Sequence, residues 1–164
     1  MFRCTVMALL LIACSSVGAM EMRRPMNTQW LAYHFDGNAF RPGSGAKGAT
    51  VHLKDGYLPS FEAVGGKETK LPEGKGAIAG ICYLQTAGGK LKQGDTYMPL
   101  QNVLVEIIGA SWRQTVKTTP SGFFVAVPPP GDYEVRLPGA TGKIGVERGK
   151  TSLLAVRGGK RMVD

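Results

Sequence analysis

The sequence predicts an all-β chain built around a small antiparallel Greek-key β-sandwich, with an irregular N-terminal extension. Between residues 103 and 137, four runs rich in β-branched and aromatic residues recur at a spacing of roughly ten residues, separated by turn residues. The 164 residues also include 23 glycines and 10 prolines, a composition that favours turns and strands over helices. A chain of this length can bury one core, so we expect one domain with extensions.

The first predicted strand of this stretch covers residues 103–108. Val103, Val105 and Ile107 recur at period two, as expected when one face of a strand points into the core. A second strand is predicted over residues 114–119, where alternating threonine and lysine residues indicate a solvent-exposed face.

Turn residues separate the remaining strands of the stretch. Residues 120–122, Pro-Ser-Gly, predict a reversal because proline fixes φ and glycine accepts a positive φ. A strand over 123–127 follows, and three prolines at 128–130 end it because proline donates no ladder hydrogen bond. A Gly-Asp turn then leads into the last strand of the stretch, residues 133–137.

Further elements are predicted on both sides of this stretch. Residues 76–81 indicate an opening strand, and the glycine- and lysine-rich residues 87–96 indicate a longer loop that could carry specific contacts. Residues 144–147 and 151–156 predict two final strands. Residues 158–164 are expected to form a basic tail.

Several motifs support a family resemblance. Residues 76–81 and 99–105 match the first two strands of the family, and residues 129–135 match its Pro-x-Gly-x-Tyr-x-Val hairpin. The turn that begins at Thr118 matches its Thr-x-x-x-Gly-x-Phe pattern. With these motifs the chain resembles the carboxypeptidase regulatory-like domain over about half its length.

That resemblance implies a transthyretin-like or Ig-like β-sandwich over residues 75–157. It also implies an accessory module, because such domains bring no catalytic residues with them. The chain departs from the family at Thr119, where an acidic residue is common. This departure weakens the idea of a metal or polar clamp at the turn, but not the expected fold.

The N-terminus predicts export. Arg3 precedes the apolar run 4–12, and small residues follow, which indicates a signal peptide and not a permanent membrane span. Two cleavage sites compete. Leu-Ile-Ala before Cys14 resembles the lipobox of bacterial lipoproteins, which would remove residues 1–13 and lipidate Cys14; ordinary cleavage would instead remove residues 1–19. We expect a periplasmic protein anchored to the membrane through Cys14, with a secreted form as the alternative. In a Gram-negative cell, Ser15 after the cysteine would suit sorting to the outer membrane.

Residues 20–74 are expected to form an extended segment and linker. They hold too few aliphatic residues for a core of their own, although the aromatic run 30–35 could form a strand or a docking segment. We therefore expect this region to lie against the sandwich or against a partner.

Little in the sequence points to catalysis. Cys82 is the one cysteine that neither cleavage removes or modifies, so no internal disulfide can form and a buried, inert thiol is expected. His34 and His52 lack a third ligand at a metal-binding spacing. Asp132 and Glu134 stand two apart, but no nucleophile, base and orienting group can be assembled. We expect no catalytic residue, metal or cofactor, and hence no enzyme.

The charge and the aromatic residues suggest binding functions. The net charge is +8 and the pI is about 9.6. For an exported protein, acidic glycans, lipid headgroups or an envelope protein complex are better partners than nucleic acid. Trp112 and Arg113 are expected at an exposed loop tip. The first hypothesis is an accessory or scaffolding protein that binds another cell-envelope component; the alternative is a carbohydrate-binding module that uses Trp30, Tyr97 or Trp112.

Overall fold

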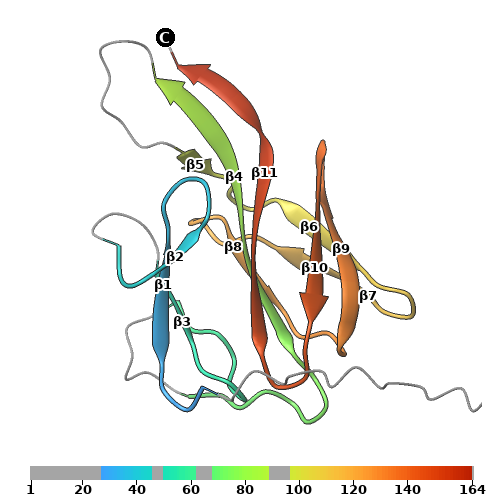
Figure 1. Cartoon of the computed structure of the whole chain (residues 1–164). Coiled ribbons are helices and arrows are strands. Elements are labelled where there is room, and N and C mark those ends of the chain that lie inside the picture. Colours follow the sequence, from blue (N-terminus) through green and yellow to red (C-terminus); the bar gives the residue numbers. More distant parts are fainter. Residues whose placement is uncertain (1–26, 46–49, 62–67, 89–96, 164) are drawn as a thin grey trace, which may run out of the picture.

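The computed structural model describes residues 27–45, 50–61, 68–88 and 97–163, and the chain is all-β in these ranges. They hold eleven strands and no helix, hence no helix able to cross a membrane. Two sheets pack face to face, and a smaller third sheet lies against the outside of one of them (Figure 1). The predicted β-sandwich is thus confirmed. Cys14 and both predicted cleavage sites lie outside the described residues.

The first layer is a four-stranded antiparallel sheet in the order β10-β9-β6-β7. Its strands are β6 (Leu104–Ile108), β7 (Arg113–Lys117), β9 (Gly131–Leu137) and β10 (Ala140–Val146). In β6, Val105 and Ile107 are fully buried, whereas Leu104 is 61% exposed. Tyr133 and Val135 of β9 are buried in the same alternating way. The period-two pattern that predicted these strands therefore separates their core face from their solvent face.

The second layer is centred on β4. Its strands are β4 (Ala77–Gly88), β5 (Tyr97–Pro99), β8 (Phe123–Ala126) and β11 (Thr151–Val163). One edge of β4 pairs antiparallel with β8 and then with β5, and the other edge pairs with β11 along the whole strand. The pairing of β4 with β11 is parallel and departs from the antiparallel arrangement that the sequence predicted. Residues 77–83 are buried, and parallel strands require such coverage.

The main core lies between these two layers. Its buried residues are Ile78, Cys82, Val105, Ile107, Phe124, Ala126, Tyr133, Val135, Leu137, Val146 and Val156. Gly80 of β4 lies opposite Phe124 of β8, and any side chain at position 80 would overlap the Phe124 ring. The Phe124 ring thus covers Gly80 within the second layer, which we call the middle sheet because the third sheet lies on its other side.

Cys82 lies in this core as the sequence predicted. Its side chain is fully buried and forms no disulfide. Removal from water raises the pKa of the Cys82 thiol to about 12, because the thiolate would lose its hydration. The thiol therefore stays protonated at physiological pH.

The N-terminal extension is more regular than predicted. It forms a three-stranded antiparallel sheet in the order β2-β1-β3, with strands β1 (Leu31–Phe35), β2 (Phe40–Pro42) and β3 (Thr50–Leu53). Phe35 is 1% exposed, and its ring centroid lies 4.7 Å from that of Tyr83 and 4.8 Å from that of Tyr97. This aromatic group covers the outer face of the middle sheet, so the extension packs against the sandwich.

Two predicted boundaries also differ. Strand β11 continues to Val163, so residues 158–163 are part of a strand where a tail was predicted. Strand β4 continues to Gly88, and residues 89–96 of the predicted loop lie outside the described residues.

Two threonine hydroxyl groups close the turns beside β7 and β8. The Thr118 hydroxyl donates to the Leu100 carbonyl oxygen at 2.7 Å and accepts from the Val103 backbone N–H at 2.9 Å. The Thr119 hydroxyl accepts from the Phe123 backbone N–H at 3.1 Å. Neutral threonine hydroxyls thus hold these turns by polar contacts, although position 119 lacks the acidic residue that is common in the family it resembles.

Candidate binding surface

The outer face of the β10-β9-β6-β7 sheet carries a row of alternating chemistry. Strand register places Lys143 beside Glu134, Glu134 beside Ile108, and Ile108 beside Arg113. In β6, β9 and β10 these residues alternate with buried or half-buried positions, and Arg113 stands opposite Ile108 in the register, so all four belong to the face opposite the core. The row therefore reads cation, anion, apolar residue, cation across four strands.

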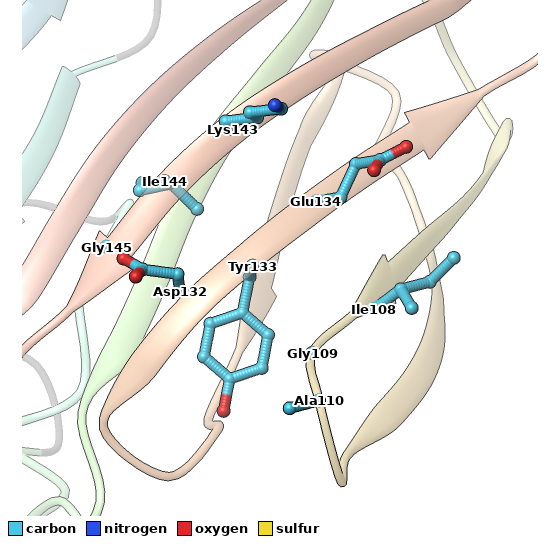
Figure 2. A pocket seen from close by; sticks show the side chains of 9 residues that line it. All are labelled: Ile108, Gly109, Ala110, Asp132, Tyr133, Glu134, Lys143, Ile144 and Gly145. Atoms are coloured by element: carbon cyan, nitrogen blue, oxygen red, sulfur yellow. The ribbon is translucent and has the colours of Figure 1, made fainter.

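A shallow hollow of about 610 Å³ opens beside this row. It lies where β6 leaves β9 after the last register pair, Ile108 with Glu134. The Gly109 N–H donates to the Trp112 carbonyl oxygen at 2.8 Å, which turns the chain into β7 and away from the start of β9. The lining residues are Ile108, Gly109, Ala110, Asp132, Tyr133, Glu134, Lys143, Ile144 and Gly145 (Figure 2).

Tyr133 supports the hollow from below. Its side chain is 7% exposed, and its hydroxyl donates to the Pro129 carbonyl oxygen at 2.8 Å. Burial raises the pKa of the Tyr133 hydroxyl. A Cβ atom at Gly109 would lie 2.5 Å from Cε1 of the Tyr133 ring, so only glycine fits there. The Trp112 ring packs edge-on against Tyr133 on its core side, with centroids 5.6 Å apart, so Tyr133 is held between the core and the hollow.

The charged side chains around the hollow are partly paired. The Arg136 Nε–H donates to the Glu134 carboxylate. This hydrogen bond, with the nearby charges of Arg136 and Lys143, lowers the pKa of Glu134. The same contact raises the pKa of Arg136. Asp132 is exposed beside Gly145 in the neighbouring strand, where a Cβ atom would lie 3.3 Å from its Oδ1.

These groups suit non-covalent contacts. The hollow is lined by carboxylates, one ammonium group and apolar side chains, with no thiol or imidazole among them. Within the described ranges, no three His, Cys, Asp or Glu side chains are placed to hold a metal ion. The Cys82 thiol is buried in the core and away from solvent. The surface offers hydrogen bonds, charge pairing and a small apolar centre.

The structure brings one of the four predicted binding residues to this surface, since Arg113 is exposed and pairs in register with Ile108. Trp112, which was expected to be exposed, is half-buried and packs against Tyr133 and the main core, and it does not line the hollow. Both residues come where the turn after β6 leads into β7.

The other two predicted residues belong to separate aromatic groups. Trp30 is half-buried, donates from Nε1 to Glu68 at 2.8 Å, and packs on Tyr57 with ring centroids 6.0 Å apart. Tyr97 packs on Phe35, under the third sheet. The rings of Trp30, Tyr97 and Trp112 therefore contact three different sets of intramolecular neighbours.

Sequence reasoning did not assign Ile108, Glu134 and Lys143 to a common site. A two-residue loop joins β9 to β10, since Leu137 pairs with Ala140 and Gly139 has a φ of +80°. The sequence signal for this arrangement was the Pro138-Gly139 dipeptide between the two segments that form β9 and β10. A hairpin loop of that length fixes which residues of the two strands stand opposite each other.

Comparisons of the chain with protein-family models, with curated proteins and with solved structures gave no match. The surface is therefore interpreted from its own geometry and charges.

Proposed function

We propose that the chain is an exported, non-enzymatic accessory protein that binds a protein component of the bacterial cell envelope. The binding surface is the outer face of the β10-β9-β6-β7 sheet. The observation that carries this proposal is the row of Lys143, Glu134, Ile108 and Arg113 beside the hollow. Protein interfaces combine a small apolar centre with a polar rim of both signs, and this surface has that composition.

The mixed charge favours a protein over a polyanion as the partner. An acidic glycan or a layer of lipid phosphates would meet the carboxylates of Asp132 and Glu134 as well as the cations. Like charges brought together at an interface cost binding free energy, whereas a protein can present complementary groups of both signs. The separate packing of Trp30, Tyr97 and Trp112 supports the same choice, because a sugar platform needs rings on a shared face.

A rigid sheet suits this role. Tyr133 and Val135 anchor β9 in the core, so the side chains that alternate with them are held in fixed relative positions. Preorganised contacts lose less conformational entropy on binding than contacts from a mobile loop. The proposed lipid at Cys14 would keep the module at the membrane, close to other envelope proteins.

Site-specific photo-crosslinking in the native host tests the surface. A photoreactive residue at Ile108 should give one crosslinked protein species, identified by mass spectrometry. The control is the same residue at Leu31, which is 44% exposed on β1, away from this sheet. Crosslinks of equal yield from both positions, or none from Ile108, would refute the proposal.

A charge reversal adds a matched comparison. Lys143→Glu should reduce the crosslink yield from Ile108, because it replaces a cation of the row with a third carboxylate. Lys70→Glu changes the net charge equally at an exposed residue outside the sheet and should leave the yield unchanged. Equal effects of the two variants would indicate general electrostatics instead of a defined site.

Intact mass of the protein extracted from native-host membranes tests the anchor separately. A diacyl or triacyl adduct on a chain that begins at Cys14 supports anchoring. An unmodified chain that begins at Met20 would replace the anchored form by the secreted one and would leave the surface proposal standing.

A further inference from the structure

The hollow lies where one strand pairing stops and the next continues. The register of β6 with β9 ends at the pair of Ile108 with Glu134, whereas β9 stays paired with β10 as far as Gly131. Asp132 is therefore the first exposed side chain of β9 that has no β6 residue beside it. On its other side stands Gly145, which has no side chain. An acidic group thus lines the hollow without a bulky neighbour in either strand.

Hydrogen bonds alternate along β6 between its two neighbouring strands. The Gly109 N–H donates to the Trp112 carbonyl oxygen at 2.8 Å, and the Thr118 N–H donates to the Val103 carbonyl oxygen at 2.9 Å. Both bonds connect odd-numbered residues at the ends of β6 to the β7 side. In an antiparallel pair the backbone groups of successive residues point to opposite sides, so the even-numbered residues of β6 face β9.

Asp132 is the residue of β9 that this ladder leaves out. Glu134 and Arg136 pair with even-numbered residues of β6, so their backbone groups point toward β6, and those of Asp132 point the same way. Because the register ends at Ile108 with Glu134, no described backbone group bonds to the Asp132 N–H or carbonyl oxygen. Both groups open on the side of the hollow, where β6 has turned away.

The Asp132 carboxylate also lacks a cation. Its side chain forms no hydrogen bond or ion pair with any residue in the described ranges. The other charges at the hollow balance each other, since the hydrogen bond from Arg136 and then the charge of Lys143 lower the pKa of Glu134. Figure 2 shows the Asp132 carboxylate beside Gly145, apart from these groups. The unsatisfied acceptors of the hollow are therefore concentrated at Asp132.

These acceptors suit a guanidinium group. Arginine carries five N–H donors in one plane, so it can donate to a carboxylate and to a carbonyl oxygen at the same time. The ammonium group of lysine is a strongly hydrated point charge without a flat face to pack against Ile108 and Ala110. The hollow measures about 610 Å³, within the range of about 300–1,000 Å³ that ligand pockets span. It can hold the side chain and the backbone that carries it.

We propose that the hollow receives an arginine side chain of the partner protein, with its guanidinium bonded to the carboxylate and the backbone carbonyl oxygen of Asp132. The Asp132 N–H donates to a carbonyl oxygen of the segment that carries the arginine. Tyr133, which is held in the core beneath, fixes the position of Asp132 on β9. Because the arginine belongs to the partner proposed above, this inference rests on that function.

Blocked tripeptides test the hollow without the partner. The probe is acetyl-Gly-Arg-Gly-amide; one control has citrulline, which keeps the shape and loses the charge, and the other has lysine. In amide NMR spectra of the chain from Met20 onward, the probe should shift Gly109, Asp132 and Gly145 with roughly millimolar affinity. Both controls should bind about fivefold more weakly. The net charge of +8 repels cationic peptides in general, so localised shifts report the hollow.

Three variants separate a defined site from general electrostatics. Asp132→Asn should weaken binding of the arginine peptide by about fivefold or more, because the guanidinium loses its charged acceptor. Glu106→Gln removes an equal charge from an exposed residue of the same face, outside the hollow, and should bind as the parent does. Ala110→Leu fills part of the hollow at constant charge and should also weaken binding. The amide spectra verify that each variant folds.

Two results would overturn the arginine site. One is equal weakening by Asp132→Asn and Glu106→Gln, which would show attraction by net charge alone. The other is a lysine or citrulline peptide that binds as tightly as the arginine peptide, or shifts that lie away from the hollow.

Crosslinking from Ile108 distinguishes this inference from the proposed function. We expect Asp132→Asn to lower the crosslink yield and Glu106→Gln to leave it unchanged. A crosslink whose yield is the same in Asp132→Asn would overturn the arginine contact and leave the binding surface standing. No crosslink, together with localised binding of the arginine peptide, would refute the proposed partner and support a guanidinium site in the hollow.

Discussion

The Thr118 hydroxyl offers the sharpest test of what holds the sandwich together. Thr118 is 2% exposed, and its Oγ1 both donates to the Leu100 carbonyl oxygen and accepts from the Val103 N–H. These bonds fix the loop that leads from β5 into β6, in which Asn102 has a φ of +56°. Thr118→Val keeps the shape of the side chain and removes both hydrogen bonds.

The expected cost follows from the two bonds. Each intramolecular hydrogen bond contributes about 1 kcal/mol net, and a partner left unsatisfied costs about 1–3 kcal/mol. Because both partners are only part-buried, water can reach them in part, and we expect Thr118→Val to lower the free energy of unfolding by about 2–3 kcal/mol. Thr118→Ser keeps the hydroxyl and loses one methyl group, which costs about 1 kcal/mol.

Urea unfolding followed by circular dichroism measures both variants against the parent chain. The slopes of the transitions should agree, so that the midpoints report stability. A Val variant that is no less stable than the Ser variant would refute the reasoning, because the methyl group and not the hydroxyl would then carry the contribution.

Three further outcomes are expected. Gly80→Ala should lower the free energy of unfolding by about 1–3 kcal/mol, since the new methyl group overlaps the buried Phe124 ring; an unchanged urea midpoint would contradict this overlap. In the chain from Met20 onward, iodoacetamide should leave Cys82 unmodified in buffer and alkylate it in urea, because burial raises the pKa of the thiol to about 12; modification of the folded chain would contradict the burial. The NMR titration midpoint of Glu134 should lie below that of an ordinary glutamate, and Arg136→Gln should raise it. Because the pKa of Glu134 is lowered on folding, its contribution to stability is present above the unfolded-state pKa and is lost as the pH falls through the folded-state value.

The alternation of apolar residues was enough to predict the strands of the first layer. Val105 and Ile107 in β6, and Tyr133 and Val135 in β9, point inward as the period-two pattern indicated. That pattern works where one face of a strand is buried and the other is solvated, because burial then repeats with the pleat.

The partner of β4 could not be predicted in the same way. Residues 77–83 are buried, so β4 shows no alternation that could orient it. Its outer half continues through Gln85 and Thr86, and β11 continues through two glycines and two basic residues, which local patterns assign to loops or tails. Parallel pairing between segments far apart in the chain leaves no local signal at either of them.

The site was predicted in part for related reasons. Arg113 follows the turn after β6, and such loop tips are common places for contacts, whereas Trp112 at the same turn packs against the core. The hollow arises where β6 leaves β9, and that divergence depends on the register of strands that are distant in sequence. Trp30 illustrates the opposite case, because its ring is held by Glu68 and Tyr57, partners that a scan for exposed aromatic residues does not reveal.

The pairing of β4 with β11 also determines when this protein can fold. Strand β4 is the first strand of the sandwich and pairs with β11, the last strand described. Ala77 therefore cannot form its native pair before Thr151 is present. During synthesis, an emerging chain that ends before β11 exposes the edge and part of the face of β4. Contacts between distant segments slow folding, because a long loop must close before they form. The sheet around β4 therefore cannot complete its native pairing before the residues of β11 are available, which makes this pairing a late step of folding.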